Sequence, residues 1–190
     1  MNALDDLILP AVEAAVAESR RRAGEWIACR AGCASCCHAA FAITALDAER
    51  LRAGLAAHPN AAAIRARAAA YAAAIRDTFP GEWETGRLTE DETWRDWFFG
   101  RMKGGMPCPA LDAARGECEL YEHRPVACRL HGHLIQIGEG EETARCELCF
   151  VGATAAEMVA CRVRMIEPEV VGEDDRGQTI VALALTEERG

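Results

Sequence analysis

The stretch CRAGCASCC, residues 29–37, places four cysteines within nine residues, and two of them, Cys36 and Cys37, are adjacent. A thiol is open to oxidation, so a cluster of this density needs a chemical reason. Six more cysteines follow along the chain, at Cys108, Cys118, Cys128, Cys146, Cys149 and Cys161. The use of these sulfur atoms is therefore the first question that the sequence raises about the fold.

The composition favours metal binding over disulfide bonds as the use of the cysteines. The chain has 190 residues, of which 51% are hydrophobic, and this is enough for one domain with its own core. Its start, MNALDDLILP, is acidic where an export signal is basic, and no run reaches the roughly 20 apolar residues of a membrane-spanning helix. We therefore expect a cytoplasmic protein outside the membrane, where reduced thiols bind metals more often than they pair.

The charge and the motifs exclude some classes of function. The formal net charge of -9 argues against nucleic acid as a partner, because an acidic surface is repelled by phosphate backbones. The sequence contains no Gly-rich phosphate loop, no GxSxG nucleophile and no convincing acid-base pair. His131 and His133 alternate on a predicted strand, so both face one side; the two imidazoles either form a minor metal pair or, as is commoner and as we expect, face solvent.

Helical periodicity dominates the chain outside its cysteine-rich middle. Apolar residues from Leu4 to Val16 recur at helical spacing, and Pro10 predicts that the regular helix begins near it, because proline fits a first turn. Capping and periodicity predict further helices over residues 44–55, 60–79, 89–104 and 154–165. A short strand entering a turn is predicted at 133–142, and the segment QTIVALAL at 178–185 fits a strand or a helix.

These patterns predict one domain over residues 1–190 with a mainly α fold. Between residues 106 and 149 the helical periodicity disappears, and proline, glycine and cysteine take over. We therefore expect helices around an irregular, cysteine-rich metal-binding centre, with a small β-hairpin or short strands.

Two CxxC steps give the strongest sign of a metal site. Cys33 with Cys36, and Cys146 with Cys149, can each present two sulfurs to one ion or cluster. The adjacent Cys36 and Cys37 differ, because consecutive side chains diverge on a helix or a strand. Either one of this pair is a spectator, or the two sulfurs serve two centres or a polynuclear one.

Three further cysteines, Cys108, Cys118 and Cys128, follow at equal intervals of nine intervening residues. Proline on both sides of Cys108 restricts the backbone around this sulfur. Arg124 and Arg129 flank Cys128 in sequence, and they either offset thiolate charge or form ordinary surface ion pairs.

The motifs CRAGCASCC at 29–37, CPALD at 108–112 and CELYEHRPVACR at 118–129 resemble those of the YkgJ-type cysteine-cluster family. These CxxCxxCC proteins are described as zinc- or iron-chelating domains. The resemblance covers residues 27–131, so residues 146–190 form a C-terminal extension. It implies that Cys29, Cys33, Cys36, Cys37, Cys108, Cys118 and Cys128 are metal ligands. Some members carry a further cysteine downstream, which adds Cys146 and Cys149.

The chain has more cysteines than one metal site can use. A structural zinc ion binds four cysteines, and so does an iron-sulfur cluster. Two closed sites need eight cysteines, whereas a cluster with accessory cysteines needs fewer. We expect an iron-sulfur cluster or zinc as the cofactor and lean toward iron-sulfur, given the excess of cysteines and the adjacent pair. Cys161 lies on a predicted helix, and we expect it to be a buried apolar residue.

Two classes of function remain open at this stage. The first is a metal-binding module, which would be a carrier, a sensor or a structural platform for a protein partner. The alternative is an iron-sulfur enzyme, an oxidoreductase or a methyltransferase-like protein. Only the resemblance supports the enzyme, since some family members carry oxidoreductase labels and flagellin lysine methylases contain a similar cysteine motif. The resemblance transfers no substrate and no catalytic residue.

Overall fold

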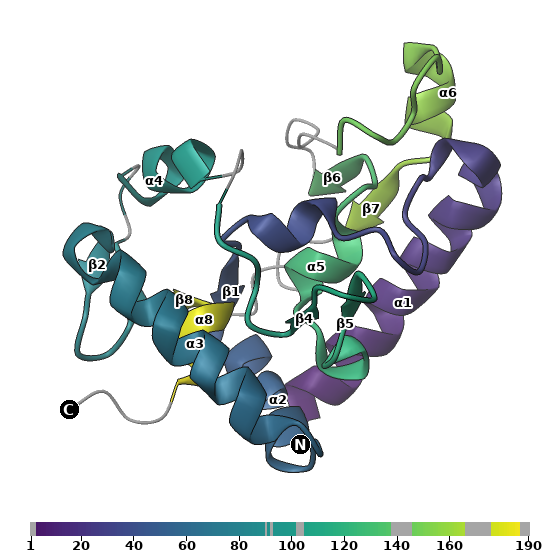
Figure 1. Ribbon diagram of the computed structural model, residues 1–190. Helices are drawn as coiled ribbons and strands as arrows, with labels where there is room; N and C mark the ends of the chain where they lie inside the picture. The colour runs from purple at the N-terminus through teal and green to yellow at the C-terminus, as the bar shows by residue number, and fades with distance from the viewer. Residues whose placement is uncertain are drawn as a thin grey trace. The chain divides into compact units, whose positions relative to one another are not determined.

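The computed structural model describes residues 3–89, 91, 93–101, 105–137, 146–165 and 176–186 (Figure 1). The chain divides into two compact units, each built from two separate stretches of sequence. Unit 1 comprises Met1–Cys33 and Val126–Glu173, and unit 2 comprises Ala34–Pro125 and Asp174–Gly190. The assignment of the whole chain to a single domain stays a prediction.

Unit 1 is organised along its longest helix, whose apolar stripe is buried. Its described elements are α1 (Ala3–Ala23), η1 (Gly24–Trp26), α5 (Val126–Leu130), β6 (Ile135–Ile137), α6 (Ala155–Ala160) and β7 (Val163–Met165). Ile8, Val12 and Val16 of α1 pack with residues of α5 and β7. β6 and β7 pair in parallel, with Ile135 opposite Val163. This packing fixes the helix that leads into the first cysteines.

Pro10 lies inside α1, so the prediction that the regular helix begins near it is wrong. An interior proline removes a backbone hydrogen bond and costs about 3 kcal/mol or more. Burial of a Val or Ile side chain contributes about 1.5–3 kcal/mol, and Ile8, Val12 and Val16 are all buried. The packing of the stripe therefore outweighs the local cost of the proline.

The helix predicted over residues 154–165 is shorter than expected. Thr154 caps α6 and forms a capping box with Glu157, as the sequence suggested. The helix ends at Ala160, however, and Val163 and Met165 are buried in β7 beside β6. Pairing with a strand distant in sequence overrides the helical preference of this short segment.

Unit 2 contains most of the helices and three short strand pairs. Its described elements are η2 (Ser35–His38), β1 (Ala42–Thr44), α2 (Ala45–Ala56), α3 (Ala61–Ile75), η3 (Arg76–Thr78), β2 (Gly81–Glu82), β3 (Arg87–Leu88), α4 (Thr93–Arg101), β4 (Leu111–Asp112), β5 (Glu117–Cys118), η4 (Tyr121–His123), β8 (Gln178–Ile180) and α8 (Val181–Leu185). The helices predicted over residues 44–55, 60–79 and 89–104 are present as α2, α3 with η3, and α4. Gly104, the predicted end of the third, lies outside the described residues.

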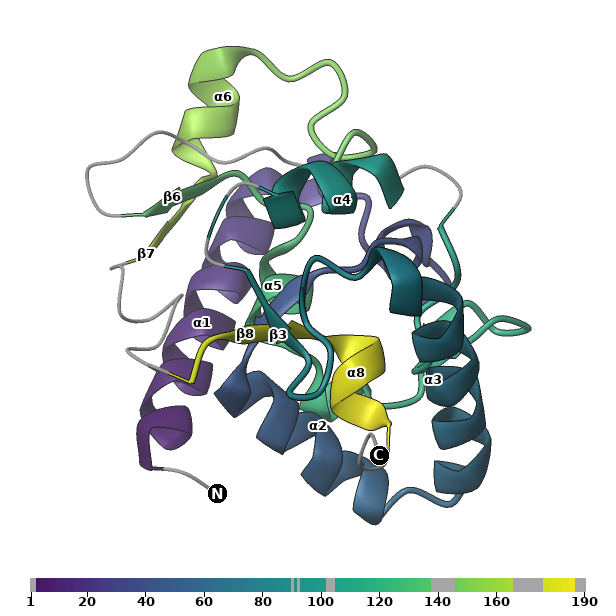
Figure 2. The same ribbon diagram turned by 90° about the vertical axis from the view of Figure 1, so that its left-hand side faces the viewer.

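The core of unit 2 surrounds α8, all of whose residues are buried. α8 packs against both α2 and α3 (Figure 2). The strand before it, β8, pairs antiparallel with β1, with Ala42 opposite Ile180. The segment 178–185 is thus a strand followed by a helix. An apolar run of this length fits both structures, and only its neighbours in space decide between them.

A tight hairpin formed by β4 and β5 positions one of the cysteines. Leu111 lies opposite Cys118, and the Asp112 carboxylate accepts hydrogen bonds from the amides of Ala114 and Arg115, at 3.0 and 3.2 Å. Gly116 closes the turn with a φ of 68°. Helices dominate the described residues, and this hairpin and the other short strands form a small β component. The predicted mainly α fold is therefore confirmed.

The strand predicted at residues 133–142 is present as β6, and its turn lies outside the described residues. In the part of the chain that is described, no helix has the length and apolar character needed to cross a bilayer.

Candidate metal centre

The cysteines fall into both units, and the boundary between the units cuts the first CxxC step. Cys33 ends the first stretch of unit 1, and Ala34 begins unit 2. None of the ten cysteines forms a disulfide bond. Unit 1 holds Cys29, Cys33, Cys128, Cys146, Cys149 and Cys161, and unit 2 holds Cys36, Cys37, Cys108 and Cys118.

Four cysteines of unit 1, which we call the unit-1 set, are Cys29, Cys33, Cys146 and Cys149. Cys149 is buried in a small apolar cluster with Ile27 and Phe150, and Cys29 and Cys146 pack against this cluster. The amide of Phe150 donates to the Trp26 carbonyl at 2.7 Å, which holds the second CxxC beside the first cysteines. Residues far apart in sequence are therefore brought together at this set.

Gly132 leaves the space that two of these sulfurs occupy. Its φ is 101°, a value that other residues adopt only with strain. A β-carbon at this position would lie 2.6 Å from Cys29 Sγ and 3.4 Å from Cys149 Sγ. The Cys29 thiol donates a long hydrogen bond to the carbonyl of His131, the residue preceding Gly132, at 3.8 Å. The backbone of residues 131–132 thus forms one wall of the set.

Burial and mutual proximity both disfavour the charged form of the unit-1 thiols. Burial is the largest cause that raises the pKa of Cys29 to about 12, and Cys149, Cys33 and Cys146 raise it further. Burial also raises the pKa of Cys146, with added contributions from Cys149 and Cys33. Thiolates in this arrangement would repel one another, and a bound cation is what would stabilise them together.

The second group, the unit-2 set, consists of Cys36, Cys37, Cys108 and Cys118. Cys36 and Cys37 lie on η2, and the amide of Cys108 donates to the Cys37 carbonyl at 2.6 Å. Cys108 and Cys118 both pack against the core cluster of unit 2. The proximal cysteine motif and the distal hairpin therefore meet in this unit.

The unit-2 thiols also act on one another. A hydrogen bond with the Cys37 side chain is the largest cause that raises the pKa of Cys36, and burial is the next. Burial raises the pKa of Cys108 to about 12, and repulsion from Cys118 and Cys36 adds to it. The adjacent Cys36 and Cys37 thus belong to one group of interacting thiols.

Arg124 brings a positive charge to the unit-2 set. Its guanidinium carbon lies 3.9 Å from the centre of the Tyr121 ring, a cation-π geometry. Its charge lowers the pKa of Cys36 and of Cys118, opposing the burial that raises them. Arg129 differs, because it is buried in an ion pair with Glu13 of unit 1. Of the two readings left open by the sequence, Arg124 fits the one in which arginine offsets thiolate charge.

His133 was expected in solvent, and the structure shows this to be wrong, since the residue is only 1% exposed. Its Nδ1 lies 2.8 Å from Ser19 Oγ, and Ser19 donates to the Cys161 carbonyl at 2.5 Å. Burial, and then the charge of Arg20, lower the pKa of His133 to about 4. The missed signal is Ser19 itself, a polar residue at helical spacing from Val12 and Val16 on the buried stripe of α1.

The donor chemistry fits a thiophilic metal, but the side chains do not form a closed shell. Thiolate sulfur is the ligand that zinc and iron-sulfur clusters prefer, and each takes four. Within the described residues, no three or more His, Cys, Asp or Glu side chains are arranged so that they could hold one metal ion. Metal binding would therefore require each set of sulfurs to draw closer together.

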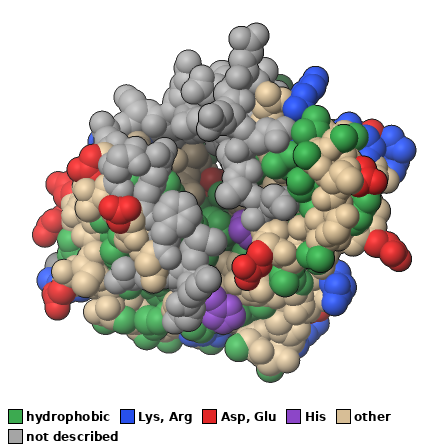
Figure 3. Space-filling model, turned by 90° about the horizontal axis from the view of Figure 1, so that it is seen from above, with side chains coloured by type: hydrophobic (Ala, Val, Ile, Leu, Met, Phe, Trp, Pro, Cys, Tyr) green, Lys and Arg blue, Asp and Glu red, His purple; other side chains and the backbone are tan. Residues whose placement is uncertain are grey.

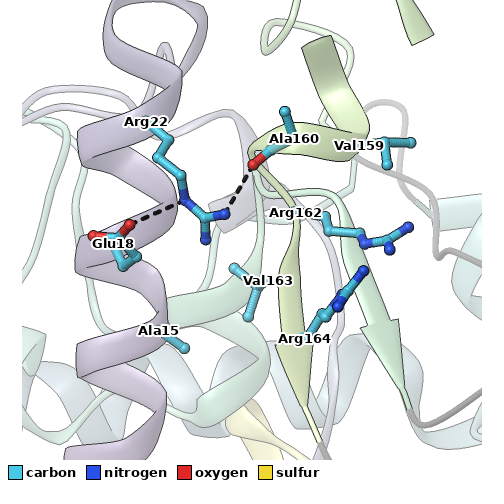
Figure 4. A pocket seen from close by; sticks show the side chains of 8 residues that line it. All are labelled: Ala15, Glu18, Arg22, Val159, Ala160, Arg162, Val163 and Arg164. Atoms are coloured by element: carbon cyan, nitrogen blue, oxygen red, sulfur yellow. Dashed lines mark hydrogen bonds and ion pairs between the residues drawn. The ribbon is translucent and has the colours of Figure 1, made fainter. Parts of the chain in front are cut away.

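Of the two described pockets, the larger lies in unit 1, and no cysteine lines it. It has a volume of about 480 Å³ and lies between α1 and the segment from α6 to β7 (Figure 4). Arg22, Arg162 and Arg164 line it, and Arg22 donates to the Ala160 carbonyl at 2.8 Å and pairs with Glu18 at 3.2 Å. A second pocket, of about 280 Å³ in unit 2, includes Cys118 among polar side chains.

The structure places the predicted ligands as follows. It brings Cys29, Cys33, Cys146 and Cys149 near one another, and likewise Cys36, Cys37, Cys108 and Cys118. Cys128 lies on α5, and its role as a ligand stays a prediction. Cys161 follows the end of α6 and is 3% exposed in an apolar cluster, as expected for a residue that serves packing.

Comparison with known proteins yields one family. A family model named CxxCxxCC and described as "Putative zinc- or iron-chelating domain" matches residues 28–150. No curated protein and no solved structure matches the chain.

Proposed function

Because the chain belongs to the CxxCxxCC family of zinc- or iron-chelating domains, and so binds metal, we propose that its cysteine thiolates hold the metal as part of the folded structure. We favour iron-sulfur over mononuclear zinc as the form of the metal. The proposed ligands are Cys29, Cys33, Cys36, Cys37, Cys108, Cys118, Cys128, Cys146 and Cys149.

The observation that carries this proposal is the convergence of thiols from distant segments. Cys29 lies beside Cys149, and the Cys37 backbone is hydrogen-bonded to Cys108. Partly buried thiols at such close range stay protonated without a cation, as their raised pKa values indicate. Metal binding converts thiols to thiolates and ties the segments together, so its free energy contributes to folding.

The adjacent pair supports iron-sulfur over mononuclear zinc. Cys36 and Cys37 belong to one set, and two consecutive residues are poorly placed to chelate a single tetrahedral ion. In a cluster with several irons the two sulfurs bind different iron atoms, so they need not converge on one point. When bound, such a cluster would supply one-electron chemistry, while the cysteines hold it and Arg124 offsets its negative charge.

Purification without oxygen tests the proposal. A brown protein with broad charge-transfer absorption, iron and labile sulfide would support an iron-sulfur centre. A colourless protein with stoichiometric zinc would support metal binding by thiolates and reject the iron-sulfur form. Material that contains neither transition metal nor sulfide would refute the proposal as a whole.

We further propose that the protein works in the cytoplasm with metal ions, and with a protein partner if it acts as a carrier, sensor or platform. We expect it not to bind nucleic acid. On the face shown in Figure 3, the described arginines form small separate groups with acidic side chains between them, which suits a chain of net charge -9. The alternative, an iron-sulfur enzyme of the oxidoreductase or methyltransferase-like type, stays a prediction from the resemblance.

A further inference from the structure

Resting on the proposed function, we infer that the CxxCxxCC motif is divided between two metal sites, one in each unit. The first site is formed by Cys29, Cys33, Cys146 and Cys149, and the second is formed around Cys36, Cys37, Cys108 and Cys118. Cys33 and Cys36, although spaced as a CxxC pair, then bind different metal centres. The ligand is a thiophilic metal, as iron-sulfur clusters or as zinc.

The geometry of unit 1 supports a site that the unit builds from its own residues. The sulfurs of Cys29 and Cys149 both face the space left by Gly132. Cys146 and Cys149 are joined by a turn in which the Cys149 amide donates to the Cys146 carbonyl at 3.0 Å. The Cys33 amide donates to the Arg30 carbonyl, also at 3.0 Å, which closes a similar turn. The charge of the Cys33 thiolate raises the pKa of both Cys29 and Cys146.

Unit 2 supplies its own four sulfurs from two segments. The proximal segment is η2, with Cys36 and Cys37, and the distal segment runs from Cys108 to the β4–β5 hairpin with Cys118. The Cys108 amide joins the two segments through the Cys37 carbonyl. The charge of Arg124, in the same unit, lowers the pKa of both Cys36 and Cys118, so one cation lies near both segments.

The backbone on either side of Cys33 explains why its CxxC step is divided. In the step from Cys146 to Cys149 the turn closes between the two cysteines themselves. In the proximal motif one turn closes before the step, from Cys33 to Arg30, and the next closes within η2, where the Cys37 amide donates to Ala34 at 2.9 Å. Cys33 thus ends one turn and Cys36 lies inside the next, so their side chains are not held by one turn.

The number of sulfurs fits the division. Each set has four cysteines, which is the number that a closed zinc site or an iron-sulfur cluster takes. The described side chains do not yet form a shell, so four sulfurs have to move inward when metal binds. With two sites, each unit has to rearrange only its own segments.

Two matched double variants test the division. Cys146→Ser with Cys149→Ser removes half of the unit-1 set, and Cys108→Ser with Cys118→Ser removes half of the unit-2 set. We expect each double variant to retain about half of the wild-type metal per chain, a two-fold loss. In each variant the intact set should stay protected from iodoacetamide while the remaining cysteines of the damaged set react. Cys161→Ala, a buried cysteine outside both sets, is the control and should keep all the metal.

A second measurement does not depend on the variants folding. Metal-free wild-type chain is loaded with one equivalent of zinc, alkylated with iodoacetamide and fragmented in a mass spectrometer. Chains that carry one zinc should contain the four protected cysteines of the unit-1 set, because the adjacent Cys36 and Cys37 of the unit-2 set are poorly placed to chelate one tetrahedral ion. Protected cysteines drawn from both sets, or complete metal loss in either double variant, would overturn the division. Wild-type protein that binds no metal would instead refute the proposed function, so the two failures are distinguishable.

Discussion

Replacing Gly132 by alanine is the sharpest test of the cysteine arrangement in unit 1. The new β-carbon would lie 2.6 Å from Cys29 Sγ and 3.4 Å from Cys149 Sγ. Good contact between heavy atoms lies at about 3.5–4.0 Å, so the Cys29 sulfur has to move by about 1 Å. Metal-sulfur distances in a formed site tolerate only about 0.2 Å. Because the unit-1 sulfurs still have to draw together to bind metal, this displacement should keep the Cys29 sulfur from reaching its place in the formed site, and the sulfur should be lost as a ligand.

The same change also costs stability, and two terms contribute. Alanine at a φ of 101° is strained by about 1–3 kcal/mol. Crowding in a packed site adds about 1–3 kcal/mol. Gly152→Ala separates the two terms, because Gly152 has a φ of 81° and would place its β-carbon where nothing lies within 4 Å. It should show the backbone strain without the crowding.

Urea unfolding and metal analysis of both variants provide the assay. We expect Gly132→Ala to be less stable than Gly152→Ala and to lose about half of its metal, while Gly152→Ala keeps full metal. The readings are independent, because the metal content is measured on folded protein at low urea. Equal metal content and equal unfolding midpoints in the two variants would refute the placement of Cys29 and Cys149 around residue 132.

Three further changes have defined outcomes. Cys128 is one of the nine proposed ligands but belongs to neither four-cysteine set, so Cys128→Ser should lower the metal content if this cysteine is an accessory ligand, and full loading by metal analysis would leave only the eight cysteines of the two sets. Cys161→Ala should leave the metal content unchanged and lower stability by about 1 kcal/mol, since the residue is 3% exposed; a drop in metal would contradict its packing role. Burial lowers the pKa of His133 from its ordinary 6.5 to about 4 in the folded protein, so the stability it contributes is present above pH 6.5 and is lost as the pH falls toward 4. The loss should reach about 3 kcal/mol in urea unfolding, and His133→Gln should flatten it; an unchanged pH profile in that variant would show that another group is responsible.

The sequence alone determined the features that depend on neighbours along the chain. Thr44 with Asp47 forms the capping box of α2, because the residues that satisfy one another are three positions apart. The helices α2 and α3 follow from periodicity in the same way. The supply of thiols and the choice of a soft metal also follow from the sequence, because ligand chemistry belongs to the side chain and not to its position.

The tertiary structure decided what depends on residues far apart in the chain. Pro10 stays within α1 because Val12 and Val16 are buried against distant elements, and Val163 joins a strand because β6 lies beside it. His133 is buried because it meets Ser19 across 114 positions of sequence. In the same way Cys29 meets Cys149, 120 positions later in the chain. Spacing sets which sulfurs can share a metal locally, but long-range packing selects which of them meet, because the energy of burial depends on the final neighbours and not on their order in the chain.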